Sequence, residues 1–101
     1  MEKYVIKRNG EYRPFEEFKI KDAIEKSFNS VQLAIDEKVV DSVFEQLLSK
    51  TTWAVEEIQD CIEKTLFEKQ YFDVMRSFML FRHTRKLQRE HINGLNEDTT
   101  Y

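Results

Sequence analysis

The sequence predicts a mainly helical fold with a small β element, in which a four-helix bundle is capped by an N-terminal β-hairpin. The chain has 101 residues, which is the size of a single domain. Only two glycines and one proline interrupt it, and this scarcity of helix breakers favours helices. Four segments repeat apolar residues at helical spacing, whereas the first fifteen residues hold two β-prone runs around an Asn-Gly pair.

The hairpin is predicted over residues 4–13, with strands at 4–7 and 11–13. Asn9-Gly10 is the preferred pair for a type I′ turn, because both central residues need a positive φ. Pro14 has no amide hydrogen to donate, so we expect it to end the second strand. Since an isolated two-stranded hairpin is marginal in water, this one must lie on the helices that follow.

Four helices are predicted after the hairpin. The first covers about residues 16–28 and ends at Asn29-Ser30, and the second is capped by Asp36. The third follows Thr51-Thr52, and the fourth runs from about Tyr71 to Arg89. The apolar faces are Ile20, Ala23, Ile24 and Phe28; Val39, Val40, Val43, Phe44, Leu47 and Leu48; Val55, Ile58, Ile62 and Leu66; and Val74, Phe78 and Phe81, with Met75 and Met79 beside them. From residue 90 to 101 the periodicity is lost, which predicts a linker.

Charge is distributed unevenly along the chain. The net charge is −3, which gives no general attraction for nucleic acid. Residues 29–73 carry ten acids and four bases, whereas residues 76–89 carry five bases and no acid. No run of eighteen apolar residues and no signal peptide is present, so we expect no membrane association. The single cysteine, Cys61, is expected in the core and fits a reducing cytoplasm.

The sequence contains no constellation typical of catalysis. It lacks a Gly-rich phosphate loop, and His83 and His91 are too far apart for a metal-binding pair on one helix turn. Acids at the start of the third helix, Glu56 and Glu57, suit the positive end of its dipole. We therefore expect no catalytic residue and no metal site. Trp53 and Phe15 are read as core residues.

Cations gather at two places. Lys7 and Arg8 lie at the hairpin, and Lys19 follows at the start of the first helix, where a cation opposes the helix dipole. That position is easier to understand if an anion such as phosphate lies nearby. The fourth helix adds a stripe at spacings of three and four: Arg82, Arg85 and Arg89. The alternative interpretation is solvated charge, protecting a sheet edge in one case and forming a basic face in the other.

Taken in order, these motifs resemble the ATP-cone, the regulatory nucleotide-binding domain of ribonucleotide reductases. The matching residues span about 3–89: Val5-x-Lys7-Arg8-x-Gly10, Pro14-Phe15, Lys19-Ile20, the run from Val55 to Asp60, Ile62-Glu63, Val74 through Phe78, Phe81-Arg82 and Arg85. Residues 95–101 resemble the link into the catalytic barrel of the anaerobic, glycyl-radical class. The chain would then be the N-terminal regulatory part, residues 1–89 with a linker at 90–101, of an anaerobic ribonucleoside-triphosphate reductase.

The resemblance implies that ATP and dATP, with Mg²⁺, bind as allosteric effectors and not as substrates. ATP would keep the reductase active, and dATP would switch it off through oligomerisation or a conformational change. The implied partners are adenine nucleotides, the catalytic domain of the parent reductase and further copies of the chain. Whether one or two nucleotides bind is left open, although the basic stripe of the fourth helix would suit two.

The resemblance also implies a set of nucleotide-binding residues. Val5, Lys7 and Arg8 would line the pocket, with the two cations near the phosphates, and Lys19 would reach the triphosphate. Gln59 stands where some members have histidine, and Val55 stands where a threonine is often found and so lacks its hydroxyl. The remaining candidates are Arg82, Arg85, Arg13, Lys26, Glu56 and Arg89.

Two alternatives belong to other functional classes. A degenerate cone could act only as a protein-contact module, although retention of Val5, Lys7, Arg8 and Lys19 argues against this. The same cone also occurs in a zinc-containing transcriptional repressor, which carries a Cys-rich ribbon before it. No such cysteines precede the cone here, so the repressor fits poorly.

Overall fold

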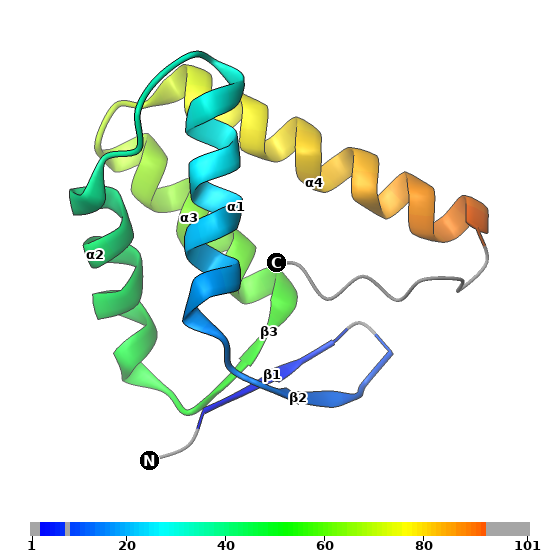
Figure 1. Cartoon of the computed structure of the whole chain (residues 1–101). Helices are drawn as coiled ribbons and strands as arrows, with labels where there is room; N and C mark the ends of the chain where they lie inside the picture. The colour runs from blue at the N-terminus through cyan, green and yellow to red at the C-terminus, as the bar shows by residue number, and fades with distance from the viewer. Residues whose placement is uncertain (1–2, 8, 93–101) are drawn as a thin grey trace.

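The computed structural model describes residues 3–7 and 9–92, with side chains described through residue 84. The elements in order are β1 (Tyr4–Ile6), β2 (Tyr12–Pro14), α1 (Glu17–Ser30), α2 (Glu37–Gln46), a short 3-10 helix η1 (Leu47–Ser49), β3 (Thr52–Ala54), α3 (Val55–Glu68) and α4 (Phe72–Ile92). The helices pack together, and the strands lie at one end of the bundle (Figure 1). This confirms the predicted fold class.

The sheet has three strands, one more than predicted. β1 lies in the centre, antiparallel to β2 and parallel to β3. In the parallel pair, Tyr4 lies opposite Thr52 and Ile6 lies opposite Ala54. The prediction treated the segment before α3 only as a connection, because three residues are too few to display a periodic pattern. The third strand joins the predicted hairpin directly to the start of α3.

The predicted two-residue type I′ turn is wrong. The Gly10 N–H donates to the Lys7 carbonyl at 2.8 Å, and the Lys7 N–H donates to the Glu11 carbonyl at 2.8 Å, so three positions separate the paired residues. Gly10 has a φ of 87°, whereas Asn9 does not have a positive φ. Asn9 uses its side chain instead, accepting a hydrogen bond from the Glu11 N–H at 2.9 Å. A glycine in the left-handed region is typical of three-residue hairpin loops.

β2 ends at Pro14, as predicted, although Pro14 is itself a paired residue of the strand. Pro14 pairs with Tyr4, and the ladder continues with the Phe15 N–H donating to the Lys3 carbonyl at 2.9 Å. β2 is an edge strand, which is where a sheet tolerates proline.

Three helix boundaries differ from the prediction. α1 continues through Asn29 and Ser30, and the chain turns only at Gln32, which has a φ of 62°. α2 begins as predicted, with the Asp36 side chain accepting a hydrogen bond from the Lys38 N–H at 2.9 Å, but it gives way to η1 at Leu47. α4 extends to Ile92, three residues past the predicted end, and residues 93–101 of the expected linker lie outside the described residues.

The core lies between the helices and contains most of the predicted apolar residues. Buried residues include Ile20, Ala23, Ile24, Phe28, Val39, Val40, Val43, Leu47, Val55, Ile58, Ile62, Leu66, Val74 and Phe78, with Val5 from the sheet. Phe28 meets Tyr71 edge to face, with ring centroids 5.0 Å apart. Leu48 is 71% exposed and Met79 is also exposed, so these two residues were wrongly assigned to the buried face. Phe15, Trp53 and Cys61 are partly buried beside the core, and the Trp53 N–H donates to the Leu47 carbonyl at 3.1 Å.

Candidate functional site

The parallel pairing of β1 with β3 places Lys7 beside the start of α3. Ile6 lies opposite Ala54, so the next residues along each strand, Lys7 and Val55, are neighbours in register. Val5 and Lys7 are two residues apart and therefore point to the same side of the strand, and both are buried. Lys7 is only 8% exposed. Arg8, the other cation of the predicted pair, lies outside the described residues.

The first turns of α3 supply the next two candidate residues. Val55 is the first residue of the helix and is buried, and Gln59 follows one turn later with an exposed fraction of 4%. Because residues four apart lie on one face of a helix, Gln59 continues the surface that begins at Val55. Val5 and Val55 thus belong to one buried core cluster, and Lys7 and Gln59 are buried polar residues on the elements that carry them. Glu56 is exposed on another face of the same turn.

The N-terminus of α3 is ordered by Glu57. One of its carboxylate oxygens accepts a hydrogen bond from the Ala54 N–H at 2.9 Å, and the other pairs with the Lys50 ammonium at 2.8 Å. The Lys50 hydrogen bond and then the Ala54 hydrogen bond hold the pKa of Glu57 below its ordinary value. Glu57 thus places a negative charge in the first turn of α3, where it suits the positive end of the helix dipole.

Lys19 lies in the first turn of α1, as predicted, and has a local acidic partner. Its ammonium is 2.7 Å from a carboxylate oxygen of Glu16, and the lysine side chain is partly buried. This i,i+3 pair offsets part of the unfavourable placement of a cation near a helix N-terminus. This ion pair could have been predicted from the sequence, because Glu16 and Lys19 are three residues apart.

Two other candidates lie on exposed surfaces. Arg13 forms an ion pair with Glu11, two residues before it on the second arm of the hairpin. Lys26 pairs with Asp22 at 3.1 Å along α1. It follows Lys19 by seven residues, which is about 10 Å along a helix axis. The structure therefore does not bring Lys26 to the group formed by Lys7, Val55 and Gln59.

Arg82 faces α3 and is held by two carboxylates. Its Nη1 donates to Asp60 Oδ1 at 2.9 Å and to Glu63 Oε2 at 2.8 Å. Burial opposes the charge on Arg82, but the hydrogen bonds to Glu63 and Asp60 outweigh it and raise the pKa of the guanidinium. The alternative of a solvated basic face is therefore wrong for Arg82. Neither carboxylate was predicted to have this role, although an i,i+3 pair of acids on α3 is visible in the sequence.

The later half of α4 carries the remaining candidates. Arg85 and Arg89 are part of the helix, and their side chains lie outside the described ones. In Figure 1 this half of α4, coloured orange, projects to the same side of the bundle as the tip of the hairpin between β1 and β2. The two elements predicted to flank the nucleotide thus extend in one direction.

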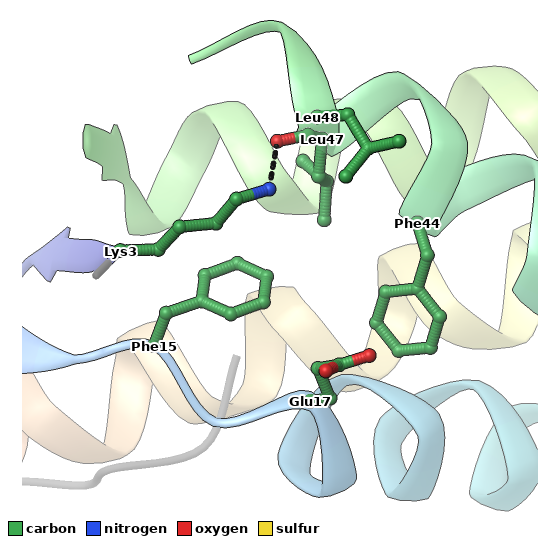
Figure 2. Close-up of a pocket in the computed structure, with 6 residues that line it drawn as sticks. All are labelled: Lys3, Phe15, Glu17, Phe44, Leu47 and Leu48. Carbon is green, nitrogen blue, oxygen red and sulfur yellow. Dashed lines mark hydrogen bonds between the residues drawn. The ribbon is translucent and has the colours of Figure 1, made fainter. Parts of the chain in front are cut away.

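Two hollows lie away from these residues. A cavity of about 300 Å³ opens between the sheet, α1 and the end of α2, and Figure 2 shows the Lys3 ammonium donating to the Leu47 carbonyl at 2.7 Å across it. It is lined by Lys3, Phe15, Glu17, Phe44, Leu47 and Leu48. A second hollow of about 410 Å³ lies over Trp53 and Cys61. Among the candidate nucleotide-binding residues whose side chains are described, none lines either hollow.

Metal-ligating side chains do not cluster within the described part of the chain, where no three His, Cys, Asp or Glu residues could hold one ion. Among the described helices, none is long and apolar enough to cross a lipid bilayer.

Comparison with known proteins gives a consistent picture. A family model described as ATP cone domain matches residues 3–87. The vitamin B12-dependent ribonucleoside-diphosphate reductase of Thermoplasma acidophilum is 37% identical over 97% of this chain and 14% of its own length. The ribonucleoside-diphosphate reductase subunit alpha of Treponema pallidum is 37% identical over 85% of this chain and 12% of its own length.

A third relative belongs to the class predicted from the tail. The anaerobic ribonucleoside-triphosphate reductase of Escherichia coli is 29% identical over 97% of this chain and 14% of its own length. The chain thus spans about a seventh of the length of these relatives. Because the similarity extends to B12-dependent and diphosphate reductases as well, assignment to the anaerobic class stays a prediction.

Proposed function

The chain belongs to the ATP cone family, and on that premise we propose that it is the adenine-nucleotide-sensing domain of a ribonucleotide reductase. ATP, bound with Mg²⁺, would favour the active state of the parent enzyme, and dATP would favour an inactive one. A ligand shifts such an equilibrium only by its difference in affinity for the two states. The domain itself performs no chemistry in this proposal.

The observation that carries the proposal is the position of Lys7. Lys7 is buried and directly follows β1, and the parallel partner of β1, β3, leads directly into α3. Backbone N–H groups and the positive end of a helix dipole favour a phosphate at the start of α3. A buried lysine close in register to a helix N-terminus supports a triphosphate site between β1 and α3.

Lys19 supports the same site from α1. Its partner Glu16 lies three residues before it and is 36% exposed, and such local, partly solvated pairs contribute little to stability. A triphosphate could therefore exchange with Glu16 as the partner of Lys19 at small cost. Arg8 and Arg85 are proposed as further phosphate ligands from their places in the sequence.

Gln59 is the proposed contact for the sugar or base. Its amide can donate and accept hydrogen bonds, whereas Val55 offers no polar side-chain atom. ATP and dATP differ by one 2′-hydroxyl, so a buried amide close to the ribose would respond differently to the two ligands. Gln59→Met, which keeps the length of the side chain, is expected to reduce the difference in affinity between ATP and dATP.

The test is a titration of the 101-residue chain with ATP, dATP and GTP in the presence of Mg²⁺. Calorimetry gives affinity and stoichiometry, and a melting series gives the ligand-induced shift. A ligand that binds only the folded state at 100 times its Kd stabilises it by about 2.7 kcal/mol. We expect both adenine nucleotides to raise Tm, and light scattering to report a different mass with dATP than with ATP.

Lys7→Ala and Lys38→Ala form a matched pair for this titration. Lys38 is exposed on α2, away from the sheet, so its removal controls for the loss of one positive charge. Weaker binding in the first variant alone is the expected result. If neither adenine nucleotide shifts Tm of the native chain, the nucleotide site is rejected and the protein-contact module is favoured.

A further inference from the structure

We propose that Arg82 is a positioning residue, whose ion pairs with Asp60 and Glu63 fix α4 against α3 and so set the geometry of the nucleotide site. In this role Arg82 does not itself bind the phosphates. The inference rests on the proposed function, because it assigns a part in that site to a residue that the sequence pattern suggested as a ligand.

The position of Arg82 on α4 is the first argument. Val74, Phe78 and Arg82 are spaced by four, so they lie on one face of the helix. The first two are buried in the core, and Arg82 is 22% exposed in the next turn. The first turns of this face of α4 thus contact the bundle through apolar side chains, and the next turn contacts it through the ion pairs of Arg82. The helix projects beyond the bundle after this point (Figure 1).

The geometry of the contact is the second argument. A single nitrogen, Nη1, reaches both Asp60 and Glu63, which are three residues apart on α3 and face the same way. Asp60 directly follows Gln59, the buried residue of the proposed site. A displacement of Arg82 would therefore move the turn of α3 that carries Gln59, together with the start of the segment that carries Arg85.

The charge balance is the third argument. Two carboxylates and one guanidinium carry a net charge of −1, which does not attract a triphosphate. Glu63 is only 19% exposed, so turning Arg82 toward a phosphate would leave a part-buried carboxylate without its cation. Removing one partner of a buried ion pair is strongly destabilising. We therefore expect Arg82 to keep its hydrogen bonds to Asp60 and Glu63 of α3 when the nucleotide binds.

The two roles of Arg82 predict opposite effects when the carboxylates are neutralised. In the Asp60→Asn, Glu63→Gln double variant, a positioning role predicts that ATP binding to the 101-residue chain weakens about tenfold, as is typical for residues coupled in one network. A phosphate-binding role predicts unchanged or tighter binding, because the guanidinium is released toward the ligand. Calorimetric affinity that is unchanged or tighter overturns the proposal.

A variant cycle gives a second criterion. Arg82→Met alone is expected to weaken ATP binding about as much as the double variant, and the triple variant is expected to bind no more weakly than either. Additive losses would mean that Arg82 and the carboxylates act separately, which overturns the proposal. If the double variant does not fold, Asp60→Asn alone replaces it, because Asp60 is mostly exposed and its substitution should not disturb the fold. This single variant is also expected to weaken ATP binding.

Arg76→Gln with Asp73→Asn is the control on the same helix. This exposed pair at 4.0 Å lies in the first turns of α4 and is expected to leave ATP affinity unchanged. Circular dichroism and melting without ligand report whether each variant is folded. If the native chain binds no nucleotide, the proposed function and this inference both fail. If it binds and the variants bind equally well, only the positioning role of Arg82 fails.

Discussion

The two ends of this molecule are held together by different kinds of interaction. In the helical bundle, side chains such as Phe28, Ile58 and Leu66 are completely buried and apolar. At the other end, three short strands meet the start of α3, Lys7 and Gln59 are buried, and Arg82 of α4 pairs with Glu63 of α3. The comparison indicates that the bundle supplies stability, whereas the sheet end supplies the polar groups for a ligand.

The dependence between the two ends is expected to run in one direction. Each strand of the sheet has only three residues, and strands this short do not form a stable sheet alone. The bundle has its own apolar core, so it does not need the sheet in the same way. Substitutions in the bundle should thus reduce global stability, and those at the sheet end should change ligand affinity.

Phe28→Ala tests the bundle and has the largest expected effect. The ring is fully buried against Tyr71, so its removal leaves a cavity and is expected to destabilise the fold by about 3–5 kcal/mol. Urea unfolding measures this loss, with Leu48→Ala as the exposed control. A variant that remains folded is expected to bind ATP with native affinity. Loss of affinity in the folded variant would contradict the separation of the two ends.

Lys7→Ala tests the sheet end and is expected to have the next largest effect. Loss of a charge-assisted hydrogen bond to phosphate weakens binding of ATP and dATP by about 1.5–3 kcal/mol. The unfolding free energy without ligand is expected to change much less than it does in Phe28→Ala. Calorimetry and urea unfolding of the same preparation give both values. Native affinity in this variant would remove Lys7 from the proposed phosphate contacts.

Asp36 tests whether a polar contact can also stabilise the bundle. As the N-cap of α2, it accepts hydrogen bonds from the Lys38 N–H and from the Tyr71 hydroxyl, the latter at 2.7 Å. Asp36→Ala is expected to cost about 0.5–2 kcal/mol by urea unfolding at neutral pH, as is usual for loss of a helix cap. Asp41→Ala, an exposed position on the same helix, is the control.

The pH dependence of this contribution has a defined sign. The Tyr71 hydrogen bond, followed by the Lys38 N–H, lowers the pKa of Asp36 in the folded state. The stabilisation is therefore complete above the ordinary aspartate pKa of about 3.9 and is lost as pH falls through the lower folded value. Unfolding experiments between pH 7 and pH 2 are expected to show a smaller acid loss in Asp36→Asn than in the native chain. Identical pH profiles would contradict this assignment.

Gly10→Ala has the smallest expected effect and examines the hairpin alone. A Cβ at this position meets no atom within 4 Å, so the penalty comes only from the φ of 87°, at about 1 kcal/mol. Gly10→Asn is the matched control, because asparagine tolerates the left-handed region better than alanine. We expect weaker ATP binding in the alanine variant with little change in Tm. An equal loss in both variants would indicate a cause other than backbone conformation.

The bundle was predictable from the sequence because its helices are long enough to repeat. Val55, Ile58, Ile62 and Leu66 recur at helical spacing, and all four are buried. The error at Leu48 has a local cause, because the chain tightens into η1 after Gln46: Leu47 stays buried and Leu48 turns outward. A periodic pattern does not reveal where a helix changes its pitch.

The candidate site was predictable only in part. The sequence singled out Lys7, Val55 and Gln59 through a family resemblance, and the structure buries all three. What it could not reveal was β3, the strand that joins β1 to the start of α3, because its partner lies far away in the chain. The partners of Arg82 were equally hidden, since a stripe of cations on one helix does not state which acids of another helix face it.

The parallel pairing of β1 with β3 has a consequence for the order of folding. Val5 pairs with Trp53, so β3 can join β1 only when the chain beyond α2 has returned to the hairpin. Closing so long a loop costs conformational entropy, and contacts between distant segments form slowly. The helices can form from local contacts, whereas the lysine of β1 reaches α3 in one of the last steps. The ligand-binding end is thus expected to close late and open early, and bound nucleotide is expected to slow amide hydrogen exchange in β1 more than in α1.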